Sequence, residues 1–317
     1  MIFWQRHMTP WKKGLASIGI VTAAILALRC TPSASPEMDG LPPQLKPFAR
    51  QIAASKLAHV DVRPVIGRTT PWDSKLRGVP YYPKDKPWPR DVEGRPLVML
   101  VQLNFSEMPP LAGYPAEGIL QIYISADYFP EKQMWGMRND NKYHTDQATR
   151  TDQSYFRVIY FPRVSPNADD LITATPAVEI DDEYSFPALD EARLTFALGS
   201  SYVRPEDYRF RRVFGLDRAE FFSRLERDKS DIEEAYEMFM GGRQYVARIG
   251  GYSRVEQMDP RLEFPDENWI LLFSLDSQVH GGYAVGWGDG GVGNFYIRPE
   301  DLARRDFSKV MYYWDLG

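Results

Sequence analysis

The side chains that could do chemistry are few and widely spaced in this sequence. The four histidines form neither an H-x-x-x-H nor an H-E-x-x-H pattern: His7, His59, His144 and His280. Zinc sites draw their ligands from closely spaced histidines and cysteines, and Cys30 is the one cysteine in the chain. No G-x-S-x-G sequence marks a nucleophilic serine. We therefore expect no metal, no cofactor and no histidine- or cysteine-based catalysis.

The remaining candidates for catalysis are two carboxylates, Asp276 and Asp289. They stand at the two ends of one strand-turn-strand unit, where paired acids could serve as acid and base or hold a calcium ion. Asp289 could equally cap its own turn by accepting backbone N–H groups, and we favour that interpretation. A hydrolase that uses this pair is accordingly an alternative to a protein without catalytic activity.

Amide and aromatic side chains are the candidates for binding. Gln102 and Asn104 could line a groove or satisfy buried backbone groups, and Trp88 and Trp287 are as well suited to a core as to a ligand platform. Residues 286–291 match G-x-G-x-x-G, but a dinucleotide site needs this motif to open a helix, and here a strand follows. The motif therefore predicts a tight glycine turn.

The elements that must position these residues are mainly strands. Aromatic residues make up 14% of the chain, and prolines and glycines recur between apolar runs, which favours short strands and turns. The predicted strands lie within residues 96–105, 118–124, 155–161, 178–196, 269–276 and 292–297.

Four helical segments are predicted between the strands. Residues 43–58 place apolar side chains near helical spacing. Two capping patterns, Asp217 with Glu220 and Ser230 with Glu233, open helices over residues 216–227 and 231–240. A short helical turn follows Pro299.

The N-terminus has the pattern of a bacterial export signal. Lys12 and Lys13 precede an apolar run over residues 14–28, which is short for a membrane-spanning helix. Cys30 lies where a lipoprotein carries its acylated cysteine, although Arg29 departs from that pattern. An uncleaved signal anchor and cleavage near Ser35 remain as alternatives. We expect a signal or anchor over residues 1–30, a linker over 31–42 and a single domain over 43–317 in the cell envelope, which meets the membrane through the N-terminal segment alone.

The net charge excludes one class of partner. The chain carries −5 at neutral pH and has no block of lysine and arginine, so a nucleic-acid backbone is not an expected ligand.

Two parts of the sequence resemble each other. Residues 97–104 lead through a loop to 118–124, and residues 270–276 lead through a loop to 291–297. Each pair consists of an apolar strand with a polar end, a loop with glycine and an aromatic strand. We interpret this as a diverged duplication around a pseudo-two-fold axis, with a period too long for a solenoid.

Ordered motifs over roughly residues 70–317 resemble the YwqG-like family of bacterial domains. The motifs are Gly78-Val79-Pro80, Trp88-Pro89, Gly94-Arg95-Pro96-Leu97 with Gln102, Gly118-Ile119-Leu120-Gln121, Gly250-Gly251-Tyr252 with Gln257 and Asp259-Pro260-Arg261, and Trp287-Gly288-Asp289-Gly290-Gly291 with Phe295-Tyr296-Ile297. Ser274 departs from the family pattern, which has a glutamine at that point.

The resemblance implies an α+β, mainly β fold with two packed strand-loop-strand repeats and a helical insert, and it implies no established activity. Members of the family occur near toxin genes. We therefore expect an exported binding protein for a protein partner, such as an immunity protein that neutralises a toxin. A module for a small ligand or the cell wall at the repeat interface is the main alternative. The candidate binding residues are Trp88, Gln102, Asn104, Gln257, Asp259, Arg261, Asp276, Trp287 and Asp289.

Overall fold

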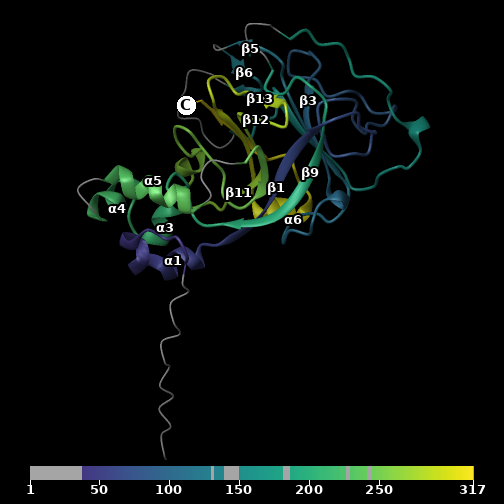
Figure 1. The fold of residues 1–317 in the computed structure, drawn as a ribbon. Coiled ribbons are helices and arrows are strands. Elements are labelled where there is room, and N and C mark those ends of the chain that lie inside the picture. The colour runs from purple at the N-terminus through teal and green to yellow at the C-terminus, as the bar shows by residue number, and fades with distance from the viewer. Residues whose placement is uncertain are drawn as a thin grey trace, which may run out of the picture. The chain divides into compact units, whose positions relative to one another are not determined.

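The structure is a computed structural model that describes residues 38–129, 132–138, 150–180, 186–225, 229–240 and 245–316. A ten-stranded antiparallel sheet dominates it (Figure 1). In chain order the strands are β1 (Leu57–Ile66), β2 (Lys75–Leu76), β3 (Val98–Asn104), β4 (Ile119–Ile124), β8 (Phe156–Phe161), β9 (Ala192–Ser201), β10 (Ala247–Gly250), β11 (Ile270–Asp276), β14 (Val292–Ile297) and β15 (Met311–Asp315). Two small sheets accompany it, one of β5 (Tyr128–Phe129), β6 (Gln133–Met134) and β7 (Met137–Arg138), the other of β12 (Gln278–His280) and β13 (Tyr283–Val285).

On each side of the central pair, the strands of the large sheet follow one another outward in chain order. The order is β15-β14-β11-β10-β1-β9-β2-β3-β4-β8, with β1 and β9 paired over their full lengths at the centre. The outer pairs also share an irregularity. A β-bulge lies between Met99 and Val101 of β3, and another between Leu271 and Phe273 of β11.

The sheet curls around one apolar core to which strands from both of its ends contribute. Phe156 of the edge strand β8 lies 5.3 Å, between ring centroids, from Tyr312 of the opposite edge strand β15. Tyr312 in turn stacks on Phe295 of β14 at 4.5 Å. Strands β3, β4, β11 and β14 are buried almost throughout, which explains their nearly continuous apolar sequences.

A helical layer covers a second apolar cluster. It consists of the 3-10 turn Pro43–Phe48, α1 (Ala49–Ala54), α3 (Phe210–Phe214), α4 (Arg218–Leu225) and α5 (Lys229–Phe239), which Figure 1 shows grouped at one side of the sheet. Its buried residues include Leu45, Ile52, Phe221 and Tyr236. A further helix, α6 (Pro299–Arg304), follows β14.

The predicted strands and helices are confirmed in outline, with shifted bounds. Four strands of the large sheet were not predicted: β1, β2, β10 and β15. Strand β9 runs on to Ser201, and α5 begins at Lys229, so the predicted cap Ser230 lies inside the helix. Asp217 accepts a hydrogen bond at 2.8 Å from the N–H of Glu220, so the predicted cap opens α4. The helix predicted over residues 43–58 ends at Ala54, and Leu57 belongs to β1, which the sequence analysis missed. The residues of β1 alternate between polar and apolar as in a half-buried strand, but the helical spacing of residues 43–58 was continued through Leu57 into this strand.

The predicted targeting run, residues 14–28, and Cys30 lie outside the described residues. Among the residues that are described, no helix combines the length and the apolar character needed to cross a bilayer. The chain is packed against the helical layer from Leu41 onward, slightly before the predicted start of the domain at residue 43.

Candidate functional site

Polar side chains on β3 and β4 hold the proline-rich segment that follows β2. Gln102 is completely buried, and its Oε1 accepts the N–H of Tyr81 at 2.8 Å. Gln121 Nε2 donates to the carbonyl of Tyr81 at 2.6 Å. Asn104 Nδ2 donates to the carbonyl of Trp72 at 3.0 Å. Gln102 and Gln121 therefore satisfy backbone groups of residues 77–97, which we call the covering segment of the first half. Asn104 satisfies a backbone group just before β2.

Trp88 also belongs to this covering layer. Its Nε1 donates to the carbonyl of Leu97 at 2.9 Å, and its ring meets that of Tyr123 edge-on at 5.4 Å. Trp287, the second predicted tryptophan, is completely buried in the main core, where its ring lies 6.1 Å from those of Trp135 and Trp314.

In the other half of the sheet, residues 250–263 form the covering segment over β11 and β14. Asn294 Nδ2 donates to the carbonyl of Arg254 at 2.8 Å. The N–H of Arg254 donates to the hydroxyl of Tyr245 at 2.8 Å, and that hydroxyl lies 3.4 Å from Ser274 Oγ. Tyr245 thus supplies the acceptor that Gln102 supplies in the first half.

Asp276 and Asp289 are not brought together. Asp276 is completely buried and binds Arg254 Nη1 through both carboxylate oxygens, at 2.6 and 2.7 Å. Burial raises the pKa of Asp276 to about 6, although Arg254 acts in the opposite direction. Asp289 is exposed in the glycine turn, in which Gly288 and Gly290 have positive φ. The turn is therefore a tight glycine turn.

Gln257 and Asp315 join the covering segment to the C-terminal strand. Asp315 Oδ2 accepts the N–H groups of Glu256 at 3.0 Å and of Gln257 at 2.8 Å. Gln257 Nε2 donates to the carbonyl of Leu316 at 3.0 Å. Burial raises the pKa of Asp315 to about 7, because few donors compensate for the lost hydration.

Asp259 and Arg261 form a buried ionic network. Arg261 is inaccessible to solvent and contacts Asp259 at 2.7 Å and Asp207 at 2.9 Å. Its guanidinium lies between the rings of Tyr208 and Tyr296, at 4.5 and 4.3 Å from their centroids. Burial would raise the pKa of Asp207, but Arg209 and Arg261 hold it well below its ordinary value. These residues hold the fold together and present nothing to solvent.

No reactive centre is assembled from these residues. Within the described ranges, no group of three or more histidine, cysteine, aspartate and glutamate side chains has the geometry to hold a metal ion. His144 lies outside those ranges. The charged side chains that the sequence analysis singled out in the interior bind one another or the backbone.

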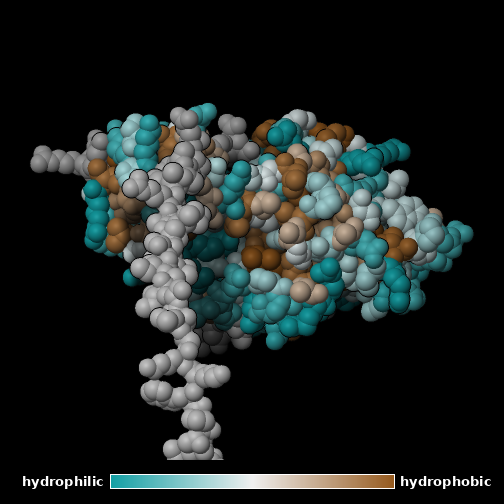
Figure 2. Space-filling model, turned by 90° about the horizontal axis from the view of Figure 1, so that it is seen from below, coloured by the Kyte–Doolittle hydropathy of each residue, from teal (hydrophilic) through white to brown (hydrophobic). Residues whose placement is uncertain are grey.

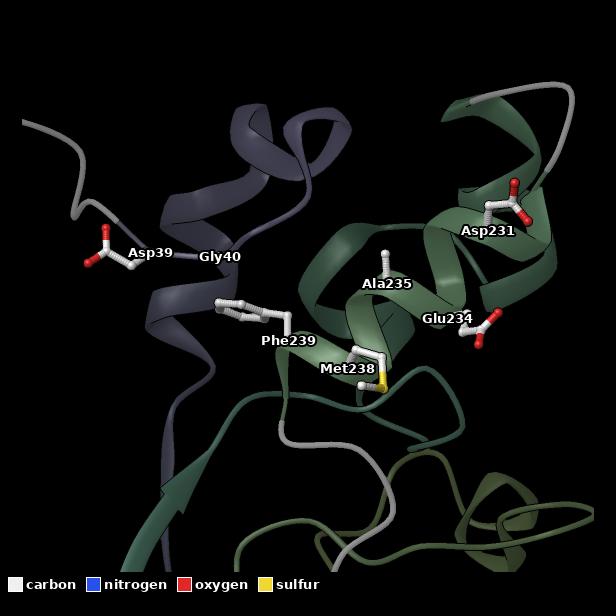
Figure 3. A pocket seen from close by; sticks show the side chains of 7 residues that line it. All are labelled: Asp39, Gly40, Asp231, Glu234, Ala235, Met238 and Phe239. Atoms are coloured by element: carbon white, nitrogen blue, oxygen red, sulfur yellow. The ribbon is translucent and has the colours of Figure 1, made fainter.

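A surface cavity that was not predicted from the sequence lies between the start of the described chain and α5. Its volume is about 690 Å³. It is lined by Asp39, Gly40, Asp231, Glu234, Ala235, Met238 and Phe239. Figure 3 shows Phe239 extending from α5 toward Gly40, with Asp231 and Glu234 further along the same helix. A second cavity of about 430 Å³ shares Gly40, Asp231 and Ala235 with it. We call the two together the acidic groove.

The lining of the acidic groove combines negative charge with apolar surface. Three of its side chains are carboxylates and none is a cation. Asp231, Glu234, Ala235 and Met238 form the solvent-facing stripe of α5, and Met238 is 70% exposed. Figure 2 shows hydrophilic and hydrophobic residues side by side over the helical layer. The helix predicted over residues 231–240 already placed these four side chains on one face, because their positions recur with helical spacing.

The chain matches a known protein family over most of its length. Residues 74–315 match a family described as a domain of unknown function, DUF1963. This range includes both covering segments and α5 but begins after Asp39 and β1. No curated protein matches the chain.

Proposed function

We propose that this chain, which belongs to the DUF1963 family of domains of unknown function, is an exported binding protein that captures a basic protein partner in the acidic groove. The observation that carries the proposal is the composition of the groove: three carboxylates around an apolar floor, with no cation in the lining. An immunity protein that neutralises a toxin is the specific form of this function that we propose.

The groove is suited to lysine and arginine side chains. Their aliphatic stems can cover apolar atoms such as those of Met238 and Phe239 while the charged ends reach Asp39 or Glu234. Complementary charge speeds association and selects the partner, and apolar contact slows dissociation. No lysine or arginine among the described residues forms an ion pair with Asp39 or Glu234.

The comparison between the two halves of the sheet supports a separate role for the helical layer. We propose that the halves are diverged copies of YwqG-like character. Arg77 and Gly78 follow β2 and have positive φ, as do Gly250, the last residue of β10, and Gly251. In the first half the ring of Trp88 packs against Tyr123 of β4. In the second half the guanidinium of Arg261 packs against Tyr296 of β14, the strand that corresponds to β4.

Such copies differ most in one connection. In the first half, residues 67–74 join β1 to β2 directly. In the second half, residues 202–246 join β9 to β10 and contain α3, α4 and α5. The first half completes its part of the sheet without such helices, so closure of the sheet does not require the insertion. This supports a binding role for α5.

A non-catalytic function is supported by the use of the interior charges. Asp276 is held by Arg254, and Arg261 is held by Asp259 and Asp207. These groups are engaged in fastening the covering segment to the sheet, so the pair Asp276 and Asp289 is not the basis of our proposal.

The proposed location is the cell envelope, and it rests on the lysine-flanked apolar run and on Cys30. If Cys30 carries a lipid, Cys30→Ser will release the body from the membrane fraction and abolish incorporation of labelled palmitate. Unchanged membrane association would instead support the uncleaved anchor.

The test of the function compares the full-length chain with the triple variant Asp39→Asn, Asp231→Asn, Glu234→Gln. Envelope proteins cross-linked to the wild type but not to the variant are identified, purified and titrated back by calorimetry. We expect the triple variant to bind at least about tenfold more weakly, and wild-type affinity to fall with added salt.

The matched control neutralises three exposed carboxylates elsewhere, Asp85→Asn, Asp169→Asn and Glu300→Gln. It should keep wild-type affinity. A partner that binds the triple variant and the wild type equally would show that the acidic groove is not the binding site.

A further inference from the structure

A third cavity, of about 400 Å³, lies where β1, β10 and the β12–β13 hairpin meet. Its lining comprises Asp61, Val62, Arg63, Tyr245, Val246, Gln278, Val279 and His280. None of these residues lines the acidic groove. The volume is within the range of small-molecule sites, and the lining mixes apolar side chains with a few polar ones, as such sites do.

Asp61 presents one free acceptor to this cavity. Arg248 contacts Asp61 Oδ1 through Nε at 3.0 Å and Nη2 at 2.9 Å, and His59 Nε2 lies 3.3 Å from the same oxygen. Among the described residues, no group binds Oδ2. The side chain is 28% exposed, so this oxygen is available to a ligand donor.

The charge of Asp61 is maintained at neutral pH. Burial alone would raise the pKa of its carboxyl group, but the contacts from His59 and Arg248 lower it below the ordinary value. An ammonium group in the cavity would therefore meet an ionised carboxylate, in which Oδ1 pairs with Arg248 and Oδ2 is left to accept a hydrogen bond.

The support behind Asp61 is rigid. His59 is 3% exposed, and its Nδ1 lies 3.2 Å from Ser201 Oγ. A Cβ added to Gly199 would lie 2.6 Å from the imidazole, and one added to Gly251 would lie 2.9 Å from His59 Cβ. Two glycines thus make room for this histidine. The chain from Ser201 through His59 fixes the carboxylate before any ligand arrives.

Positive charge lines the same cavity. Arg63 is two residues beyond Asp61 and therefore on the same face of β1. It is exposed and forms no ion pair within the described ranges, because Asp61 pairs with Arg248 instead. His280 on β12 is also exposed and has no hydrogen-bond partner among the described side chains.

We propose that this cavity binds a free α-amino acid. The ammonium group of the ligand donates to Asp61 Oδ2, and its carboxylate is held by Arg63 and His280. Its side chain lies against Val279, an exposed apolar residue of the lining. Asp61 and Arg63 lie on the same face of β1 and do not pair with each other, so their charges complement the ammonium and carboxylate groups of a zwitterion. This inference is independent of the proposed function at the acidic groove.

The experiment titrates the purified full chain by calorimetry with a panel of free L- and D-amino acids. For the tightest ligand, the N-acetyl and the amide derivatives are then measured on the wild type. We expect each derivative to bind at least about tenfold more weakly, because each lacks one of the two charges. This comparison needs no variant and so does not depend on the folding of mutants.

The variants Asp61→Asn and Arg63→Ala should each weaken binding by at least about tenfold. The matched controls Asp85→Asn and Arg157→Ala change exposed residues of the same types and should bind as the wild type does. The proposal is overturned if no amino acid binds at up to about 10 mM. It is also overturned if the acetylated and amidated ligands bind as tightly as the free one.

Discussion

Arg261 Nη2 lies 2.9 Å from Asp207 Oδ2, and both side chains are closed to solvent. The pair joins the covering segment of the second half to the chain that enters α3. Asp259 adds a second buried carboxylate at 2.7 Å. Arg209 contacts Asp207 at 2.7 Å, so two carboxylates face two guanidinium groups. The removal of Arg261 would leave Asp259 buried without its cation.

Arg261→Ala is therefore expected to lower the free energy of unfolding by about 3–5 kcal/mol. Urea denaturation followed by circular dichroism measures this directly. The control Arg211→Ala removes an exposed arginine and should change the free energy by less than about 0.5 kcal/mol. An equal effect of both substitutions would show that the buried network contributes little to stability.

The buried carboxyls of Asp276 and Asp315 predict that stability falls as pH rises toward neutrality. Their pKa values are raised by burial to about 6 and about 7, whereas the unfolded chain releases these protons near 3.8. Between these values the folded state holds protons that the unfolded state has lost. The free energy of unfolding therefore decreases from about pH 4 to about pH 7.

Asp315→Asn should remove part of this slope, because an amide keeps the acceptor for Gln257 and carries no charge. At pH 7.5 we expect the variant to be more stable than the wild type, by an amount on the order of 1–3 kcal/mol. Urea melts at several pH values measure the effect, and exposed Asp289→Asn is the control. A wild-type curve that is flat over this range would contradict the raised pKa values.

Much of the fold could be predicted because β3, β4, β11 and β14 are buried on both faces and so read as apolar runs. Strand β1 was missed although Val60 and Val62 alternate with polar residues as in a half-buried strand. The apolar spacing of the preceding helix was instead continued through Leu57. The ion-pair partner of Asp61 is Arg248, which is 187 residues away in the sequence. The residues around Asp61 therefore give no sign of how its charge is compensated.

The candidate sites show the same limit. Arg261 and Asp276 were singled out by type and motif, but their ion-pair partners hold both in the interior of the second half. The acidic groove was missed although α5 was predicted, because its far wall is made by Asp39 and Gly40, which are distant in sequence. The exposure of a side chain and the identity of its neighbours depend on the tertiary fold, whereas helix periodicity can be read from the sequence.

The glycines around the turn before β14 should differ sharply in their tolerance of alanine. A Cβ at Gly293 would lie 2.3 Å from the ring of buried Trp287, whereas one at Gly286 would meet nothing within 4 Å. We expect Gly293→Ala to destabilise the protein by at least about 1–3 kcal/mol and Gly286→Ala to have almost no effect. Thermal melts of the two variants provide the comparison, and equal melting temperatures would contradict the packing described for Trp287.

The departure of Ser274 from the family pattern leads to a final prediction. In the first half Gln102 accepts the N–H of Tyr81, but in the second half the hydroxyl of Tyr245 accepts the N–H of Arg254 at 2.8 Å. Ser274 is 3.4 Å from that hydroxyl and contributes a weak contact at most.

Tyr245→Phe should therefore leave a buried N–H without an acceptor, at a cost of about 1–3 kcal/mol, whereas Ser274→Ala should cost less than about 1 kcal/mol. Urea denaturation of both variants measures the difference, with half-buried Tyr155→Phe, whose hydroxyl lies 3.5 Å from Glu93 at the surface, as the control for loss of a hydroxyl. The hydrogen exchange rate of the Arg254 amide should rise in Tyr245→Phe alone. If Ser274→Ala were the more costly change, the tyrosine could not be the group that replaces the glutamine.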